Sequence, residues 1–274
     1  MAPDEAPDLV PLRVRLVASD LDGTLLDRTG DLSVRTRAAL DRVRGTGVDV
    51  VAVTGRPPRW VTGLDLGPGV AVCSNGALVI DLPSGDVVAE RALTPEAAAE
   101  VVARLRGLHP QGMMAVERAD GVGMESAWHE QVPRALDATV GPAEELVADR
   151  PAAKILLKVP GTSGDAYIDA AAEAVGDLGE VTASGALQLV EVSAPGVTKA
   201  TTLAMVCQER HVAAADVVAF GDARNDLAML AWAGWGVAMA DAHPTVIEVA
   251  DDVTDSTDHD GVAAWLEAHL APPP

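Results

Sequence analysis

The stretch VRLVASDLDGTLL, residues 14–26, decides the fold expected for this chain. It begins with a short apolar run and continues into two carboxylates, Asp20 and Asp22, which are followed by Gly23. A short apolar run of this kind is typical of a buried strand, and a glycine lets the chain turn sharply after it. The stretch therefore predicts a strand that delivers two carboxylates to the edge of a sheet.

One helix and two more strands are expected directly after this stretch. Ser33 is placed to cap a helix over Val34–Arg44, and the apolar runs Val48–Val53 and Val70–Cys73 predict strands. Strands joined by a helix through short connections form a parallel sheet with right-handed crossovers. All three strands end in polar residues, so we expect these residues at the carboxyl edge of the sheet, where open α/β sheets bind ligands.

The pattern changes in the middle of the chain. Apolar segments around Pro83-Ser84-Gly85 predict a hairpin, Thr94 is placed to cap a helix, and further strand-like segments surround a helical Asp165–Val175. The alternation of helix and strand returns after Pro195-Gly196. We therefore predict an α/β protein with a doubly wound, Rossmann-like parallel-sheet core, residues 1–82 and 192–274, and an inserted α+β domain, residues 83–191.

Composition excludes several classes of partner. The 274 residues include 20 Lys and Arg against 41 Asp and Glu, a formal net charge of −21, which repels nucleic acid and anionic lipid. No apolar run reaches the roughly 20 residues that a membrane helix needs. The acidic start of the chain is unlike a secretory signal, and Cys73 and Cys207 have no metal-site spacing. We expect a cytoplasmic protein that binds neither nucleic acid nor membrane.

A second acidic group belongs to the same predicted sheet edge. Asp222 and Asp226 follow the apolar run Val217–Phe220. A carboxylate can attack phosphorus without a base, but several carboxylates and a phosphate in one pocket repel one another strongly. Cations must therefore share the site, and carboxylate oxygens suit a hard divalent ion such as Mg²⁺. Lys199 would supply a fixed positive charge, and Thr54 a hydroxyl for a phosphate oxygen.

Five motifs in chain order resemble one family. They are DLDGTLL at 20–26, TGRP at 54–57, SNGA at 74–77, GVTK at 196–199 and GDARND at 221–226. Together they resemble the haloacid dehalogenase superfamily, and specifically its Cof-type branch of sugar-phosphate phosphatases, subclass IIB, in which a large C2 cap is inserted after the third strand. The resemblance covers both predicted core segments.

The resemblance implies a role for each acidic residue. Asp20 would attack phosphorus and become an aspartyl-phosphate, while Asp22 would protonate the leaving group and later activate water. Asp20, Asp222 and the backbone carbonyl of Asp22 would hold Mg²⁺, with Asp226 supporting the metal or its waters. Lys199 would hold the phosphoryl oxygens.

The resemblance also implies a phosphate site and a substrate class. Phosphate and substrate would be bound by Thr54, Gly55, Arg56, Asn75 and Asn225. The expected substrate is a small phosphorylated metabolite, such as a sugar phosphate, and the expected assembly is a monomer or weak homodimer. A phosphomutase of the same fold, or a regulator that binds sugar phosphates without turnover, remains an alternative.

Several of these residues also have structural interpretations. Thr54 or Asp226 could cap the helix that follows it, Arg56 could pair with an acidic neighbour, Asn75 could shape its turn, and Lys199 could be solvated. In the inserted domain, the basic side chains that could reach a substrate are Arg118, His129, Arg134, Lys154 and Lys158. The spacing of Lys154 and Lys158 favours one solvated strand face.

Overall fold

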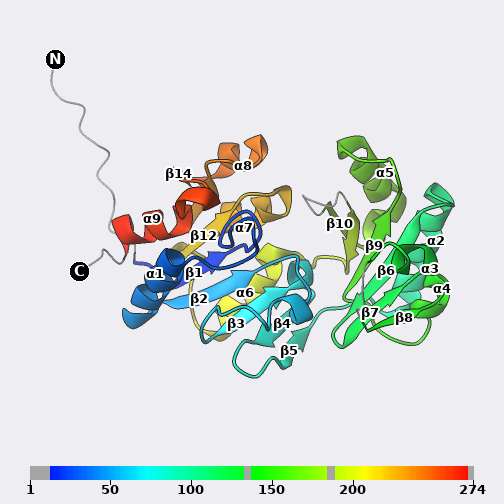
Figure 1. Ribbon diagram of the computed structural model, residues 1–274, viewed down its shortest axis with the longest axis horizontal. Helices are drawn as coiled ribbons and strands as arrows, with labels where there is room; N and C mark the ends of the chain where they lie inside the picture. Colours follow the sequence, from blue (N-terminus) through cyan, green and yellow to red (C-terminus); the bar gives the residue numbers. More distant parts are fainter. Residues whose placement is uncertain (1–12, 133–136, 184–188, 271–274) are drawn as a thin grey trace, which may run out of the picture.

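Two β-sheets organise the computed structural model, which describes residues 13–132, 137–183 and 189–270 (Figure 1). The larger sheet has the strand order β14-β13-β12-β1-β2-β3-β4-β5. Its strands are parallel from β14 to β3, and β4 and β5 are antiparallel additions at one edge. The bounds are β1 Leu16–Ser19, β2 Asp49–Val53, β3 Val70–Cys73, β4 Leu78–Asp81, β5 Val87–Glu90, β12 Val217–Gly221, β13 Trp235–Met239 and β14 Asp252–Thr254.

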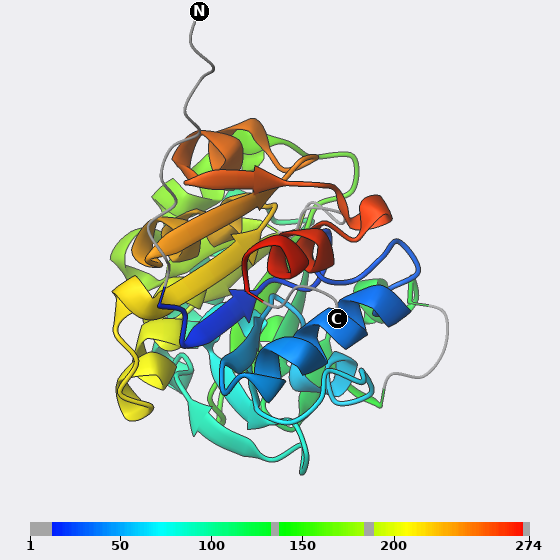
Figure 2. The ribbon, with the colours of Figure 1, turned by 90° about the vertical axis from the view of Figure 1, so that its left-hand side faces the viewer.

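Helices cover both faces of this core sheet. Helices α1 and α9 pack against each other on one face (Figure 2), and α6 and α7 pack together on the other. The cap expected at Ser33 is present, since Ser33 accepts a hydrogen bond from the Thr36 amide at the start of α1, and Thr198 caps α6. The helices are α1 Val34–Gly45, α6 Lys199–Glu209, α7 Leu227–Trp232, α8 Pro244–Val249 and α9 Gly261–His269, with single turns η1 Pro58–Trp60, η2 Ser74–Gly76, η4 Ala214–Asp216, η5 Arg224–Asp226 and η6 Thr257–His259.

The second sheet forms the cap, residues 94–193, with the strand order β10-β11-β9-β6-β7-β8. Helices α2 and α5 pack against each other on this sheet, and Thr94 caps α2 as expected. The bounds are α2 Pro95–Leu108, β6 Met113–Arg118, β7 Gly121–Met124, α3 Ser126–His129, β8 Ala138–Val140, α4 Ala143–Leu146, β9 Lys154–Lys158, α5 Asp165–Val175, η3 Gly176–Leu178, β10 Glu180–Ala183 and β11 Val190–Ser193. The fold is therefore a doubly wound α/β core with an inserted α+β cap, which confirms the predicted fold class.

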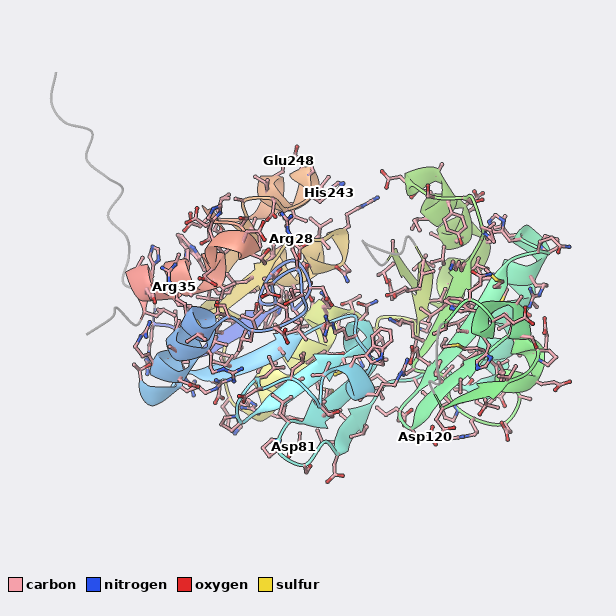
Figure 3. All side chains as sticks on the ribbon, in the orientation of Figure 1. Arg28, Arg35, Asp81, Asp120, His243 and Glu248 are labelled. Carbon is pink, nitrogen blue, oxygen red and sulfur yellow. The ribbon has the colours of Figure 1, made fainter. Side chains whose placement is uncertain are left out.

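Both predicted boundaries of the inserted domain are wrong, because each assigns a strand or part of a strand to the wrong sheet. The hairpin at 78–90 exists, but β5 pairs with β4 in the core sheet, so the core continues past residue 82. At the other end, β11 pairs with β9 and β10 in the cap sheet, so the boundary at 191/192 would divide a strand. Figure 3 places Asp81, at the end of β4, on the core side and Asp120, in the β6–β7 turn, on the cap side. A local pattern predicts a hairpin, but long-range pairing decides which sheet it joins.

The carboxyl ends of β1, β2, β3 and β12 meet at one edge of the core sheet. Ser19 at the end of β1 lies beside Ala52 in β2 and Phe220 in β12. Each strand ends within a residue or two of a predicted site residue, and the cap lies over this edge (Figure 1). In the described part of the chain, no helix combines the length and apolarity needed to cross a membrane.

Candidate active site

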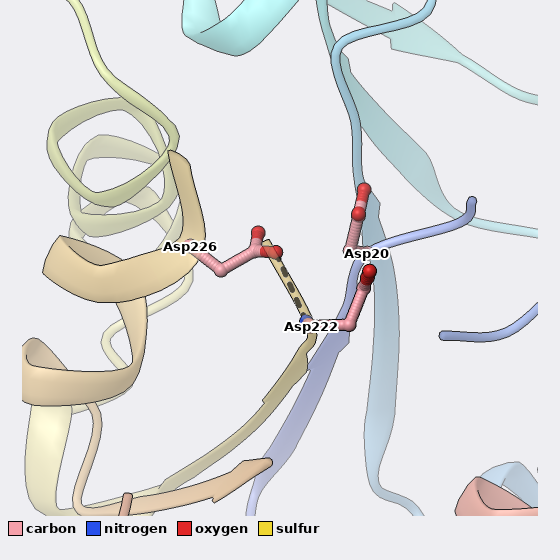
Figure 4. Close-up of side chains that lie close together, drawn as sticks. All are labelled: Asp20, Asp222 and Asp226. Atoms are coloured by element: carbon pink, nitrogen blue, oxygen red, sulfur yellow. Dashed lines mark hydrogen bonds between the residues drawn. The ribbon is translucent and has the colours of Figure 1, made fainter. Parts of the chain in front are cut away.

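Three carboxylates converge where β1 and β12 end. Asp20 follows β1, Asp222 follows β12, and Asp226 lies in the turn η5. One oxygen of each can be chosen so that the three lie within 4.8 Å of one another (Figure 4). Asp226 is fully buried and Asp20 is only 4% exposed. Oxygen donors gathered at this spacing fit a hard divalent cation such as Mg²⁺.

Lys199 provides the positive charge of this cluster. It is the first residue of α6, it is 1% exposed, and its Nζ lies 2.8 Å from Oδ1 of Asp20 and 2.7 Å from Oδ1 of Asp226. The solvated alternative for Lys199 is therefore wrong. A lysine this deeply buried remains charged only with anionic partners, and here it has two.

The burial of these groups changes their proton affinities. Burial raises the pKa of Asp20 well above its usual range, because removal from water outweighs the opposing effect of Lys199, and Asp226 and Asp222 raise it further. Burial also raises the pKa of Asp222, to about 6. Burial alone would lower the pKa of Lys199, but Asp20 and Asp226 raise it above its usual value. The site therefore holds more negative charge than Lys199 neutralises, and a bound cation would reduce the repulsion among the carboxylates.

The residues after Asp22 support Asp222. Gly23 has a φ of +81°, and a Cβ atom at this position would lie 2.4 Å from Oδ2 of Asp222. Glycine is therefore required both by its backbone conformation and by the close approach of the carboxylate. The hydroxyl of Thr24 donates to Oδ1 of Asp222 at 2.7 Å. Thr24 was not predicted to have a role, although its place in the DLDGT motif was a usable signal.

Asp22 does not belong to the three-carboxylate cluster. Its side chain is 59% exposed and forms a two-pronged ion pair with Arg56, with Nε 2.8 Å from Oδ2 and a terminal nitrogen 2.6 Å from Oδ1. The alternative in which Arg56 pairs with an acidic neighbour is thus the one observed. The predicted metal ligand at Asp22 was its backbone carbonyl, and this remains a prediction.

The loops after β2 and β3 lie against each other. The amide of Asn75 donates to the Thr54 carbonyl at 3.0 Å, and the amide of Ser74 donates to the Arg56 carbonyl at 2.9 Å. Thr54 is fully buried, and its hydroxyl accepts from the Arg56 amide rather than capping a helix. Asn225 reaches this pair of loops from η5, since its Nδ2 donates to Oδ1 of Asn75 at 3.2 Å.

Asp226 is held by the chain around it. Its Oδ2 accepts from the amides of Asp222, at 3.2 Å, and Ala223, at 3.1 Å, while its Oδ1 meets Lys199. The side chain of Asp226 thus bonds to residues that precede it and makes no capping hydrogen bond to helix α7, which follows it, so the capping alternative is not observed. Asp226 also belongs to the carboxylate cluster.

The basic residues of the cap differ from the expectation. Lys154 was expected on a solvated strand face, but it is only 3% exposed. It forms an ion pair with the buried Glu191 of the neighbouring cap strand, and it donates a hydrogen bond to a backbone carbonyl of the core. Arg118 is also buried and donates to the carbonyl of Leu146 inside the cap. Lys158 donates to Gln131, His129 is exposed at the end of α3, and Arg134 lies outside the described residues.

Two acidic residues of the cap were missed by the sequence analysis. Glu117 on β6 is 3% exposed and forms an ion pair with Arg59 of the core, with one N–O distance of 2.7 Å. Glu191 on β11 is 5% exposed and contacts both Lys154 and Asn75. Buried acids in otherwise apolar strands were the available signal, but their partners are distant in sequence.

This fold and this site define a hydrolase of known type. A family model described as haloacid dehalogenase-like hydrolase matches residues 17–266. The chain belongs to this family of enzymes, which confirms the resemblance drawn from the five motifs.

Characterised relatives are similar over nearly the whole chain. The 5-amino-6-(5-phospho-D-ribitylamino)uracil phosphatase YcsE of Bacillus subtilis is 30% identical over 260 residues, covering 91% of this chain and 93% of its own. The pyridoxal phosphate phosphatase YbhA of Escherichia coli is 27% identical, covering 94% of this chain and 100% of its own. Both relatives are named as phosphatases of small phosphorylated metabolites.

Solved structures share the fold. BT1666 of Bacteroides thetaiotaomicron, from a study of phosphatases of the haloalkanoate enzyme superfamily, superposes with a TM-score of 0.80 at 24% identity and covers 98% of this chain and 99% of its own. The subclass IIB sugar phosphatase BT4131 superposes with a TM-score of 0.76 at 19% identity, covering 93% and 98% of the two chains. At these identities the superpositions establish the fold, including the cap.

Proposed function

We propose that this enzyme is a cytoplasmic, Mg²⁺-dependent phosphatase that hydrolyses a small phosphomonoester through an aspartyl-phosphate on Asp20. The observation that carries the proposal is the buried cluster of Asp20, Lys199, Asp222 and Asp226 at the carboxyl edge of the sheet. The names of the relatives support the reaction class, because YcsE and YbhA both remove a phosphoryl group from a small metabolite.

Asp20 is suited to attack phosphorus. Its backbone amide donates to the Phe220 carbonyl at 3.0 Å, and Lys199 holds one carboxylate oxygen, so the side chain is fixed in place. An oxygen of Asp20 would form a bond to phosphorus as the bond to the leaving oxygen breaks. Lys199 would remain beside the transferred group and offset its negative charge.

Asp20, Asp222 and the backbone carbonyl of Asp22 would hold Mg²⁺, with Asp226 supporting the metal or its waters, and the ion would supply charge neutralisation for the phosphoryl group when it is bound. Thr24 orients Asp222 through the hydrogen bond to Oδ1, and Lys199 orients Asp226. Because Asp226 already accepts hydrogen bonds at both oxygens, it is suited to hold the metal's waters or to orient the other ligands.

Asp22 would carry the proton. Its exposed side chain, two residues after Asp20, would give a proton to the leaving alkoxide and later take one from the water that attacks the aspartyl-phosphate. That attack breaks the bond between phosphorus and Asp20 and releases inorganic phosphate. Both oxygens of the Asp22 carboxylate accept hydrogen bonds from Arg56 in this structure, so Asp22 would have to separate from Arg56 and take up a proton before it acts on the leaving group.

A phosphate-release screen tests the proposal. Purified enzyme with Mg²⁺ is assayed against sugar phosphates, nucleotides and phosphorylated cofactors, with the Asp20→Asn variant as matched control. We expect release of inorganic phosphate from at least one class and none above background from the variant. Transfer of the phosphoryl group within a substrate without phosphate release would contradict the proposal and identify a mutase. Binding of sugar phosphates without turnover would contradict it too, in favour of a regulator.

A further inference from the structure

A buried ion pair of the cap lies directly on the core loops of the site. Lys154 on β9 places its Nζ 3.0 Å from Oε1 of Glu191 and 2.9 Å from the carbonyl oxygen of Gly55. The side chains of Lys154 and Glu191 are 3% and 7% exposed. A lysine and a glutamate buried this completely cost free energy of desolvation, so they need specific partners. One of these partners, the carbonyl of Gly55, belongs to the core.

Glu191 also contacts the core. Its Oε2 accepts a hydrogen bond from Nδ2 of Asn75 at 2.6 Å. The same Nδ2 lies 3.0 Å from the hydroxyl of Thr182 on the neighbouring cap strand, and Oδ1 of Asn75 accepts from Asn225. A chain of hydrogen bonds thus runs from Gly55 through Lys154 and Glu191 to Asn75.

The two loops at the ends of this chain, residues 54–56 and 74–76, are termed the paired loops. Backbone hydrogen bonds from Ser74 to Arg56 and from Asn75 to Thr54 join them. Ser74 and Asn75 have φ values of 51° and 56°, a conformation that is uncommon for residues other than glycine. Such backbone persists only where surrounding contacts hold it, and the side chain of Asn75 is held by the cap.

We propose that Lys154 and Glu191 are positioning residues, which set the geometry of the paired loops from the cap and so make phosphate binding depend on how the cap is seated. This inference rests on the proposed function, in which Thr54, Gly55 and Asn75 lie at the phosphate. Neither side chain needs to touch the substrate. The Gly55 carbonyl and the Asn75 amide group are the two points at which the pair acts.

Other contacts between cap and core separate this role from simple docking. Glu117, which is buried, and Arg59, which is partly exposed, form a second ion pair across the interface, and Arg224 pairs with Asp165 at its surface. These pairs can hold the cap on the core without contacting the backbone of residues 54–56 or 74–76. Lys158, on the same strand as Lys154, reaches only Gln131 within the cap among the contacts described.

Four variants test the proposal. Lys154→Met removes the donor to Gly55, and Lys154→Met/Glu191→Leu removes both charges, so no unpaired ion is left in the interface. Glu117→Gln weakens the ion pair with Arg59, and Lys158→Met is the matched control for loss of a lysine from β9. Thermal unfolding of each variant shows whether it is folded, and we expect the double variant to melt closer to wild type than Lys154→Met does.

Three readouts report on the paired loops. They are the inhibition constant of inorganic phosphate, kcat/KM for p-nitrophenyl phosphate, and amide hydrogen exchange over residues 70–80. For both Lys154 variants we expect phosphate inhibition weakened about 10-fold or more, a loss of kcat/KM of about 10- to 100-fold, and faster exchange in that segment. We expect less than about a 3-fold change in either kinetic quantity for Lys158→Met and for Glu117→Gln.

Two results would overturn the inference. A double variant that keeps wild-type phosphate inhibition and exchange would show that the paired loops hold their geometry without the cap. Equal losses in Glu117→Gln would show that the Lys154–Glu191 pair acts only by docking the cap. Hydrogen exchange needs no turnover, so it decides the positioning role even if the wild type releases no phosphate, a result that would count against the proposed function alone.

Discussion

Replacing Asp222 with Asn should make the metal-free protein more stable while removing its response to Mg²⁺. Burial raises the pKa of Asp222 from 3.8 to about 6, so the folded protein binds this proton more tightly than the unfolded chain does. Stability of the metal-free protein therefore falls as the pH rises from about 4 to about 6, and the full cost is present above that. Asparagine has nearly the same volume, carries no charge, and keeps an oxygen for the Thr24 hydroxyl.

The size of the effect follows from the pKa shift. A shift of about two units corresponds to about 3 kcal/mol at 1.36 kcal/mol per unit. Asp222 is only partly buried, so solvent reduces this figure, and we expect a gain of about 1–2 kcal/mol at pH 7.5. At a pH near 4 the two proteins should be almost equally stable.

Urea unfolding in EDTA at pH 4.5 and pH 7.5, repeated with excess Mg²⁺, measures both halves of this prediction. The wild type should gain stability on addition of Mg²⁺, because the cation binds only the folded site. The variant should gain little. A less stable Asp222→Asn protein at pH 7.5 in EDTA, or one that Mg²⁺ stabilises as much as wild type, would refute the charge assignment of this cluster.

Two further substitutions test the remaining charged groups. Lys199→Met leaves the carboxylates of Asp20 and Asp226 buried without their cation. The free energy of unfolding should therefore fall by about 3–5 kcal/mol at pH 8 and by less at pH 5, where protons can replace the missing charge. An equal loss of stability at both pH values in urea unfolding would argue against a charge-neutralising role for Lys199. Asp22→Asn removes the proton donor, so kcat/KM for an alkyl phosphate, which covers the steps up to formation of the aspartyl-phosphate, should fall about 100-fold or more, while kcat/KM for p-nitrophenyl phosphate, whose leaving group needs little protonation, falls much less. Equal losses of kcat/KM on both substrates would exclude Asp22 as the acid.

Many elements of the core, and the first helix of the cap, could be predicted from the sequence, because local signals set them. Helix α1 begins after Ser33, and α2 begins after Thr94 with Pro95 in its first position, as the capping patterns indicated. Strand β3 has the predicted bounds Val70–Cys73. In each case the residues that decide the element lie within it or next to it in the sequence.

Short cap elements could not be predicted in this way. Strand β7, Gly121–Met124, contains two glycines, and β10, Glu180–Ala183, is half-buried without an apolar run. Neither has the composition of a strand, and each is held in place by pairing with a neighbour. Their existence depends on tertiary pairing, which overrides local propensity.

The site was predicted where its residues follow the ends of parallel strands and missed where charged side chains meet at the interface of core and cap. The convergence of Asp20 and Asp222 followed from parallel strands ending at one edge. Lys154 was expected in solvent because its strand gives no sign of Glu191, which lies 37 residues away. A single sequence places groups at strand ends reliably, but it does not show which charges meet across a domain interface.

Trapping the phosphorylated enzyme tests the central claim most directly. Wild-type protein is mixed with Mg²⁺ and a reactive phosphomonoester, quenched in acid within the first turnover, digested and analysed by mass spectrometry. We predict one phosphoryl group on the peptide that contains Asp20, and its absence from the Asp20→Asn variant treated in the same way. A phosphoryl group on another residue, or phosphate release with no covalent species at any quench time, would contradict nucleophilic attack by Asp20.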